Sequence, residues 1–153
     1  MIVYRLAKAK FSLTLSGKCA EKSGGRWNSK GVPMIYTSDS RALCTTEVAV
    51  HMPLGLLPAD YKIITIEIPD SVKTRILPKS KLPVDWKSIP HSGSTQEIGD
   101  DFIRQNKATV MKVPSAVVPG DFNFLFNPNH KDFAQIRIKK VEDFGFDSRL
   151  FGL

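Results

Sequence analysis

The sequence predicts one α+β domain over residues 1–153. Apolar residues make up 42% of the chain and charged residues 24%, which suits a folded domain with a buried core. The predicted strands and helices follow one another without the repeated strand–helix–strand units of a parallel α/β fold. The 10 glycines and 10 prolines divide the chain into short segments, as in a small domain with many loops.

The N-terminal half contains three predicted strands and one predicted helix. Apolar runs bounded by turn residues place the strands over residues 1–6, 34–37 and 61–68. Between the first two strands lies a polar loop with several glycines, residues 16–33. A helix over about 40–51 follows the second strand, because its N-terminus can be capped by Ser38, Asp39 or Ser40.

The C-terminal half is predicted to hold a long loop, a second helix and the last strands. Residues 78–95 contain three prolines and are predicted to be a loop, and residues 95–107 a helix with an apolar face. A strand is predicted over residues 110–118, with an edge or a bulge at Pro114. Two further segments complete the chain, a short apolar one and an alternating strand, over residues 122–127 and 133–141.

The formal net charge of +7 favours an anionic partner. Lysines and arginines are spread along the chain, and the densest short run alternates like the solvated face of a strand: Arg137, Lys139 and Lys140. No stretch interleaves basic and aromatic residues as a nucleic-acid-binding stripe would. We therefore expect an anionic small molecule or an acidic protein, rather than DNA, as the direct partner.

The sequence also bears on location and metal binding. No stretch approaches the roughly 20 apolar residues of a membrane helix, and residues 1–11 lack the features of a signal peptide. We therefore expect a cytoplasmic protein with no membrane contact. Cys19 and Cys44 are expected to be reduced structural thiols. Neither a metal-ligand cluster nor the spacing of a catalytic triad is present.

Glu47 lies where an apolar residue is expected. Leu43, Glu47 and Val50 fall at i, i+4 and i+7 of the predicted helix, which is the spacing of a buried face. Burying a carboxylate on such a face costs free energy unless the carboxylate is paired, so an unpaired one suggests a role in function. Glu47 is therefore a candidate functional group. The alternative is a helix rotated so that Glu47 pairs with a lysine at the surface.

The segment Gly-Gly-Arg-Trp-Asn, residues 24–28, is a candidate anion-binding loop. Its glycines allow close approach of the backbone to a ligand, and Arg26 offers planar donors that match phosphate oxygens. Trp27 supplies a broad face, and Asn28 can fix a turn or contact a ligand. The alternative is a β-turn with Trp27 in the core and Arg26 on a carboxylate.

Small polar residues also accompany the last apolar segments. Ser115 follows Pro114, and Asn123 lies among phenylalanines, which favours the floor of a polar pocket. The stretch Asn127-Pro128-Asn129-His130 is rich in turn formers. For His130 a structural or solvent-exposed role is favoured.

Taken in order, these residues resemble the RES domain, a family named for its arginine, glutamate and serine. The resemblance covers nearly the whole chain and rests on Tyr4-Arg5, Gly24 to Asn28, Gly31, Ile35 to Ser38, Glu47, Ile98 to Asp100, Val113 to Ser115, and Asn123 to His130. The sequence departs from the family at Lys131, where a proline is often found. The resemblance implies an ADP-ribosyltransferase-toxin-like fold, in which a split, twisted, mixed sheet with flanking helices surrounds a cleft for NAD⁺.

The resemblance further implies a toxin that degrades NAD⁺, in some members by phosphorolysis to ADP-ribose phosphate and nicotinamide. Glu47 would stabilise positive charge on the ribose, Arg26 would bind a phosphate, and Tyr36 would stack on nicotinamide unless it is only a core aromatic. The other substrate-binding residues are expected to be Arg5, Trp27, Asn28, Ser38, Ser115 and Asn123. NAD⁺ is expected as substrate and inorganic phosphate as co-substrate, with no cofactor and no metal.

The resemblance also implies a protein partner, and it leaves several functions open. An Xre-like helix-turn-helix antitoxin is implied, with DNA contacted only through it, and a homodimer within the complex is allowed for. The nucleophile stays open between phosphate, water and a protein side chain; the last would define a mono-ADP-ribosyltransferase that modifies a host protein. More distant alternatives are a non-enzymatic nucleic-acid-binding module, motivated only by charge, and a toxin whose site has decayed into an interaction surface.

Overall fold

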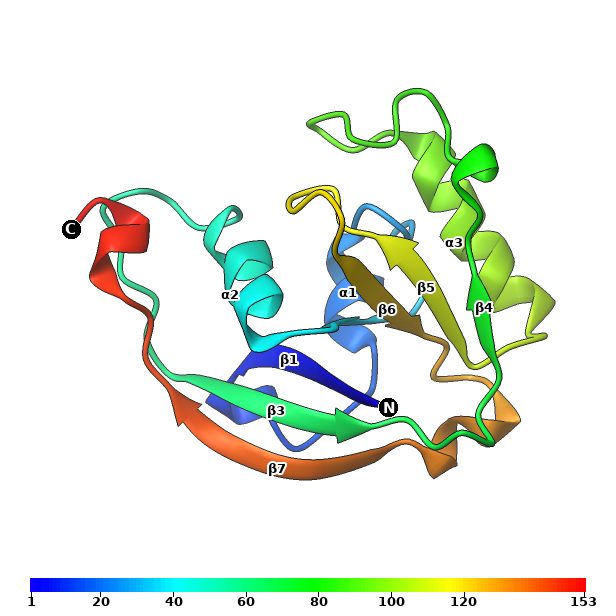
Figure 1. Cartoon of the computed structure of the whole chain (residues 1–153), viewed down its shortest axis with the longest axis horizontal. Coiled ribbons are helices and arrows are strands. Elements are labelled where there is room, and N and C mark those ends of the chain that lie inside the picture. Colours follow the sequence, from blue (N-terminus) through cyan, green and yellow to red (C-terminus); the bar gives the residue numbers. More distant parts are fainter.

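The computed structural model describes residues 1–153 as one seven-stranded sheet with three α-helices (Figure 1). The strands are β1 (Ile2–Lys8), β2 (Ile35–Ser38), β3 (Tyr61–Glu67), β4 (Thr74–Ile76), β5 (Val110–Pro114), β6 (Phe122–Phe126) and β7 (Arg137–Phe144). The helices are α1 (Lys18–Ser23), α2 (Arg41–Ala49) and α3 (Gly93–Gln105). None of these helices combines the length and the apolarity of a membrane span.

The sheet has the strand order β4-β5-β6-β2-β1-β3-β7 and is mixed. β4 and β5 run parallel, and every other neighbouring pair is antiparallel. β1 pairs with β3 along its whole length, but only Tyr4 and Ser38 are in register between β1 and β2. The sheet therefore divides into two halves at the seam between β1 and β2. The expected α+β fold with a split, mixed sheet is confirmed.

Three apolar clusters fill the two faces of the sheet. α3 packs on β5 and β6 through Phe102, and α2 packs on β1 and β3 through Cys44. A third cluster gathers around Val3 and Ile64 from β1 and β3. Complete burial of a large apolar side chain such as Phe102 stabilises the fold by about 1.5–3 kcal/mol. These contacts hold α2 and α3 on either side of the seam, as Figure 1 shows.

Most expected elements are present, with corrections at their ends. The predicted strand over 110–118 stops at Pro114, because the Ser115 side chain folds the next residues into a turn. The end of β5 is open on one side, since β4 pairs only as far as Lys112; Pro114, which has no N–H to donate, fits there. The predicted last strand over 133–141 begins later, at Arg137, after a 3₁₀ turn capped by His130.

Two elements were not predicted. α1 has six residues with no apolar periodicity, and it lies within the segment predicted to be a loop, 16–33. β4 has three residues at the edge of the sheet, and Arg75 and Ile76 are exposed, so its sequence carries no alternation to detect.

Candidate functional site

The candidate site lies at the seam, where β2 leads directly into α2. The Ser40 side chain caps α2 by accepting a hydrogen bond from the Leu43 N–H at 3.0 Å, as expected from the sequence. This cap fixes the start of the helix next to the end of β2. Ser38 at the end of β2 and Glu47 on α2 are thereby brought to the same region as Arg5 of β1.

Glu47 is half-buried and is held by donors from two other segments. Its Oε1 accepts hydrogen bonds from Ser115 Oγ at 2.8 Å and from Asn123 Nδ2 at 2.6 Å. Ser38 Oγ in turn donates to Asn123 Oδ1 at 2.8 Å. None of the salt bridges involves Glu47, so the alternative of a surface pair with lysine is not what the structure has. The carboxylate predicted to stand out on α2 is a member of a polar network.

Ser115 is fully engaged by protein atoms. Besides donating to Glu47, its Oγ accepts the backbone N–H groups of Val117 at 3.1 Å and Val118 at 2.9 Å. A hydroxyl has one donor and two acceptor positions, so this capacity is filled. Ser115 is also only 2% exposed. A direct hydrogen bond from Ser115 to a ribose or phosphate, as expected from the sequence, would have to displace one of these three.

Tyr36 and Asn28 form a second polar cluster, under the Gly-Gly-Arg-Trp-Asn loop. The Tyr36 hydroxyl donates to Asn28 Oδ1 at 2.7 Å and accepts the Trp27 N–H at 3.0 Å. Asn28 is 0% exposed, and its Nδ2 donates to the carbonyls of Ala20 and Val32. Burial raises the pKa of the Tyr36 hydroxyl well above its ordinary value. The cluster shapes the loop from beneath, and Tyr36 stays protonated as a donor.

The loop has the conformation of a tight turn with Trp27 in the core. Trp27 is 2% exposed and packs with Met34 and Phe102. A side chain at Gly25 would meet the Tyr36 hydroxyl at 2.6 Å, so this position admits only glycine without a shift. Trp27 is therefore a core residue, which was the alternative considered for it. With 2% of its surface exposed, Trp27 offers a ligand almost no contact area.

Arg26 has no carboxylate partner, so the alternative in which it pairs with a carboxylate is wrong. Its NH1 donates to the carbonyl oxygens of Trp86 at 2.7 Å and Ser88 at 3.2 Å. Gln96 of α3 adds donors to the carbonyls of Gly25 and Asn28. Arg26 therefore ties the segment 86–88 to the loop, and Gln96 ties α3 to it. Of these partners, Trp86, Ser88 and Gln96 were not among the residues predicted from the sequence. Only one nitrogen of the Arg26 guanidinium is used, so the others can reach an anion.

Arg5 is a half-buried cation that forms no salt bridge. Its NH1 makes one long hydrogen bond, to the Tyr36 carbonyl at 3.5 Å, and its Nε is buried with no partner. Burial lowers the pKa of Arg5 from its ordinary value. A buried guanidinium N–H with no acceptor costs free energy until an anion or another acceptor meets it. Arg5 is thus the feature of the site that most directly calls for an anionic ligand.

Cys44 lies near both Arg5 and Glu47. It lies on α2 beside Ser38, and both Arg5 and Glu47 influence its ionisation, so both are near it. Burial raises the pKa of the Cys44 thiol to about 12, which makes it a neutral group. Cys19, by contrast, is exposed. Both cysteines are free thiols, as expected.

The remaining sequence candidate, His130, has a structural position. Its Nδ1 accepts the Asp132 N–H at 3.1 Å and lies 2.9 Å from Thr109 Oγ1, and the residue is 8% exposed. Asn127 likewise ties Asn106 and Asn129 together. The structural role favoured for His130 is confirmed. No group of three or more His, Cys, Asp or Glu side chains is arranged to hold a metal ion.

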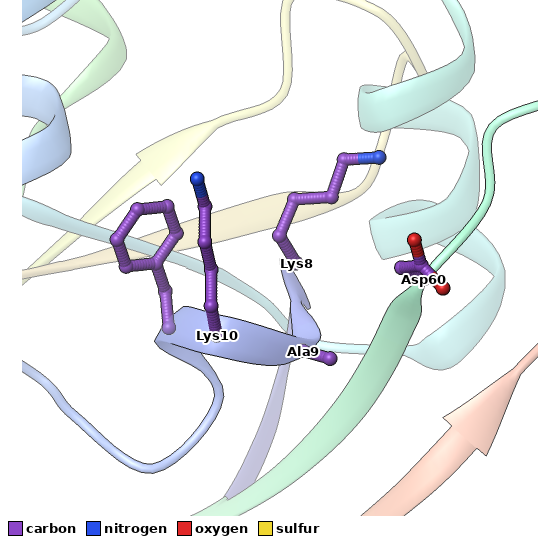
Figure 2. A pocket seen from close by; sticks show the side chains of 5 residues that line it. Lys8, Ala9, Lys10 and Asp60 are labelled. Atoms are coloured by element: carbon purple, nitrogen blue, oxygen red, sulfur yellow. The ribbon is translucent and has the colours of Figure 1, made fainter.

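A separate hollow of about 550 Å³ lies on the surface at the end of β1. It is lined by Lys8, Ala9, Lys10, Phe11 and Asp60, and Figure 2 shows the Lys8 and Lys10 side chains extending to the same side. Lys8 Nζ is already used by the Ala59 carbonyl at 2.7 Å. The hollow shares no residue with the set around Glu47, and it is a feature of the exposed surface.

Known families and proteins resemble this chain over nearly its whole length. The family model described as RES domain matches residues 2–147. Among similar proteins, "Toxin Res" of Photorhabdus laumondii is 39% identical over 152 residues, 98% of this chain and 97% of that protein. "Prs ADP-ribosylating toxin" of a Sphingobium species is 36% identical over 138 residues, 89% of this chain and 86% of that protein. The chain belongs to the RES domain family.

The fold has a counterpart among solved structures. A chain in the crystal structure of the Mycobacterium tuberculosis MbcT–MbcA toxin–antitoxin complex superposes with a TM-score of 0.73. The match covers 99% of this chain and 86% of that one at 23% sequence identity. At this identity the likeness concerns the fold, and it confirms the fold class expected from the sequence.

Proposed function

We propose that this protein is the toxin of a toxin–antitoxin pair and that it cleaves the nicotinamide–ribose bond of NAD⁺ at the seam between β1 and β2. The observation that carries the proposal is that two groups lie near each other at the seam: Glu47, a carboxylate held by two donors, and Arg5, a half-buried cation whose Nε has no partner. A ligand with negative phosphates and a ribose that becomes positive during reaction meets both groups. The names of its relatives, which are toxins, point the same way.

The chemistry needs a carboxylate rather than an acid. Nicotinamide leaves as a neutral molecule with the electron pair of the C–N bond, so it needs no proton from the enzyme. The ribose carbon passes through an oxocarbenium-like state, and an anionic Glu47 stabilises it. Arg5 and the free nitrogens of Arg26 bind phosphate oxygens, and Tyr36 lies beneath the loop that carries Arg26. Asn28 and Trp27 support that loop from beneath, and Ser38 orients Asn123.

Phosphate is the nucleophile we propose. One oxygen of hydrogen phosphate forms a bond to the ribose carbon as the C–N bond breaks, and the products are ADP-ribose phosphate and nicotinamide. The basic chain, with its formal net charge of +7, favours the approach of two anions to one site. Cleavage by water would give ADP-ribose instead.

A second candidate keeps the site and changes the acceptor. The relative named "Prs ADP-ribosylating toxin" favours transfer of ADP-ribose to a protein side chain. In that case nicotinamide release would need the acceptor protein and would be slow with NAD⁺ and phosphate alone.

The test is an NMR time course of purified protein with NAD⁺, with and without inorganic phosphate. Phosphate-dependent release of nicotinamide supports a phosphorylase, and release without phosphate a glycohydrolase. Glu47→Gln should abolish release, whereas Glu97→Gln, an exposed carboxylate on α3, should not change it. Labelled NAD⁺ with a cell extract tests the transferase. No release and no labelled acceptor would overturn the NAD⁺ proposal.

The proposed partner is an Xre-like antitoxin. Support comes from the fold match, which is to a toxin–antitoxin complex. We expect the purified pair to turn NAD⁺ over more slowly than the toxin alone. Equal rates would show that the partner does not act on this site.

A further inference from the structure

Glu47 is held by one of its two oxygens. Oε1 accepts both hydrogen bonds, from Ser115 and Asn123, while Oε2 accepts none from the protein. The two donors come from the end of β5 and the start of β6, and the carboxylate from α2. Figure 1 shows the turn that joins β5 and β6 rising beside α2. The pair of bonds therefore ties α2 to the turn between β5 and β6.

The direction of each bond in this network is determined. An ionised carboxylate only accepts, so Asn123 must turn its NH₂ group toward Glu47 and its Oδ1 toward Ser38. Ser38 must then donate its hydroxyl proton to Asn123. Ser115 donates to Glu47 while its lone pairs receive two backbone N–H groups. The two donors that reach Glu47, Ser115 Oγ and Asn123 Nδ2, both point toward Oε1, which leaves Oε2 as the free oxygen.

We propose that Ser115 and Asn123 are positioning residues that fix the Glu47 side chain so that Oε2 alone faces the reacting ribose. This inference rests on the function proposed above. A glutamate on a helix surface samples several rotamers, and its ordering costs side-chain entropy. Two donors that hold Oε1 meet that cost before the substrate binds, so the carboxylate is already aligned when positive charge develops.

The inference gives Ser115 a role that differs from direct substrate binding. If Ser115 bound the substrate, its removal would weaken NAD⁺ binding and raise KM. If it positions Glu47, its removal leaves KM within about twofold and lowers kcat, because the lost alignment matters in the transition state. The same split is expected for Asn123.

The first experiment measures kcat and KM for nicotinamide release in the wild type and in Ser115→Ala, Ser115→Thr and Asn123→Ala. We expect kcat to fall about 10- to 100-fold in the two alanine variants, and to recover partly in Ser115→Thr, which keeps the hydroxyl. Ser71→Ala, an exposed serine bonded to Gln135, is the matched control and should leave both constants unchanged.

Asn123→Asp provides a signature that a purely structural role would not give. The new carboxylate lies against Glu47. Near pH 8 both groups are ionised and repel each other, so activity is expected to fall. As the pH is lowered, one proton is shared between the two carboxylates, and activity is expected to recover. Arg5 and Cys44, the other titratable side chains near Glu47, keep their protonation over that range. Asn129→Asp adds the same charge at an exposed position and should keep the wild-type profile.

A readout independent of activity separates the two proposals. The Asn123 side-chain proton that faces Glu47 should resonate further downfield than the corresponding proton of the exposed Asn129, and Glu47→Ala should move it back toward that position. A wild-type Asn123 resonance at the ordinary position would overturn the positioning inference. So would wild-type kcat and pH profile in the Ser115 and Asn123 variants while Glu47→Gln is inactive. A wild type that releases no nicotinamide would overturn the proposed function, and the amide resonance would then decide the position of Glu47.

Discussion

The Cα of Gly99 lies against the carbonyl oxygen of Trp27: a Cβ at residue 99 would be 1.6 Å from that oxygen. This contact seats α3 on the loop that carries Arg26. Two hydrogen bonds of the same helix reinforce it, from Gln96 to the Gly25 carbonyl at 3.0 Å and from the Ser29 N–H to Asp100 at 2.9 Å. The position of Arg26 therefore depends on the absence of a side chain at residue 99.

Gly99→Ala should destabilise the protein by about 2 kcal/mol or more, because backbone must move to admit the methyl group. At this chain length such a change lowers the Tm by about 4–8 °C. Thermal unfolding of Gly93→Ala is the control, since a side chain there meets nothing within 4 Å. Equal Tm values for the two variants would contradict the packing described.

Tyr36→Phe should cost about 1–3 kcal/mol of unfolding free energy, because the Trp27 N–H loses its acceptor and Asn28 Oδ1 its donor. Tyr61→Phe is the matched control: the Tyr61 hydroxyl has no protein partner, and its ring keeps its edge contact with Phe146. Urea unfolding of both variants measures the difference. A Tyr36→Phe protein as stable as Tyr61→Phe would show that the hydroxyl contributes nothing.

Arg26→Ala should release the segment 86–88 as well as weaken anion binding. Without the bonds to the Trp86 and Ser88 carbonyls, trypsin is expected to cut after Lys87 several times faster, and the KM for NAD⁺ is expected to rise about tenfold or more. Arg75→Ala, an exposed arginine on β4, controls for loss of one positive charge. Unchanged cleavage after Lys87 would argue that the segment is held by other contacts.

The two cysteines should differ in reactivity and in their effect on alkaline stability. A thiol reagent near pH 8 is expected to label the exposed Cys19 quickly and Cys44 only after unfolding. The pKa of Cys44 is about 12 in the folded protein against an ordinary 9.0, so the unfolded state loses this proton first as the pH rises. Its stabilising effect is complete below pH 9.0 and is lost as the pH rises from 9.0 toward 12. Cys44→Ala should show a smaller loss over that window, as measured by urea unfolding; an identical loss would contradict the assignment.

Sequence patterns predicted the parts of the site that depend on local rules. The Ser40 cap places α2, and the i, i+4, i+7 spacing of α2 marks Glu47 as an exception on an apolar face. The apolar runs that predicted β1, β2 and β3 are likewise local signals. For this reason the helix and strands that border the seam were predicted within a few residues.

The partners of the site residues could not be predicted in the same way, because they lie far away in sequence. Glu47 meets Ser115 and Asn123 across 68 and 76 positions, and Arg26 meets Trp86 across 60. Gln96 shows no local signal, since a glutamine on a polar helix face is unremarkable until the helix is docked. Ser115 was singled out, but its hydroxyl was expected to face a ligand, and only the turn geometry reveals that its bonds are already used.

The network around Glu47 also has an order in time. The carboxylate is made early on the ribosome, at position 47, whereas its two donors are at positions 115 and 123. A nascent chain that ends before residue 115 carries Arg5, Tyr36 and Glu47 but has nothing to hold Oε1. A truncated product of this length is thus expected to lack an aligned carboxylate, and the arrangement is completed only when most of the 153 residues have been translated.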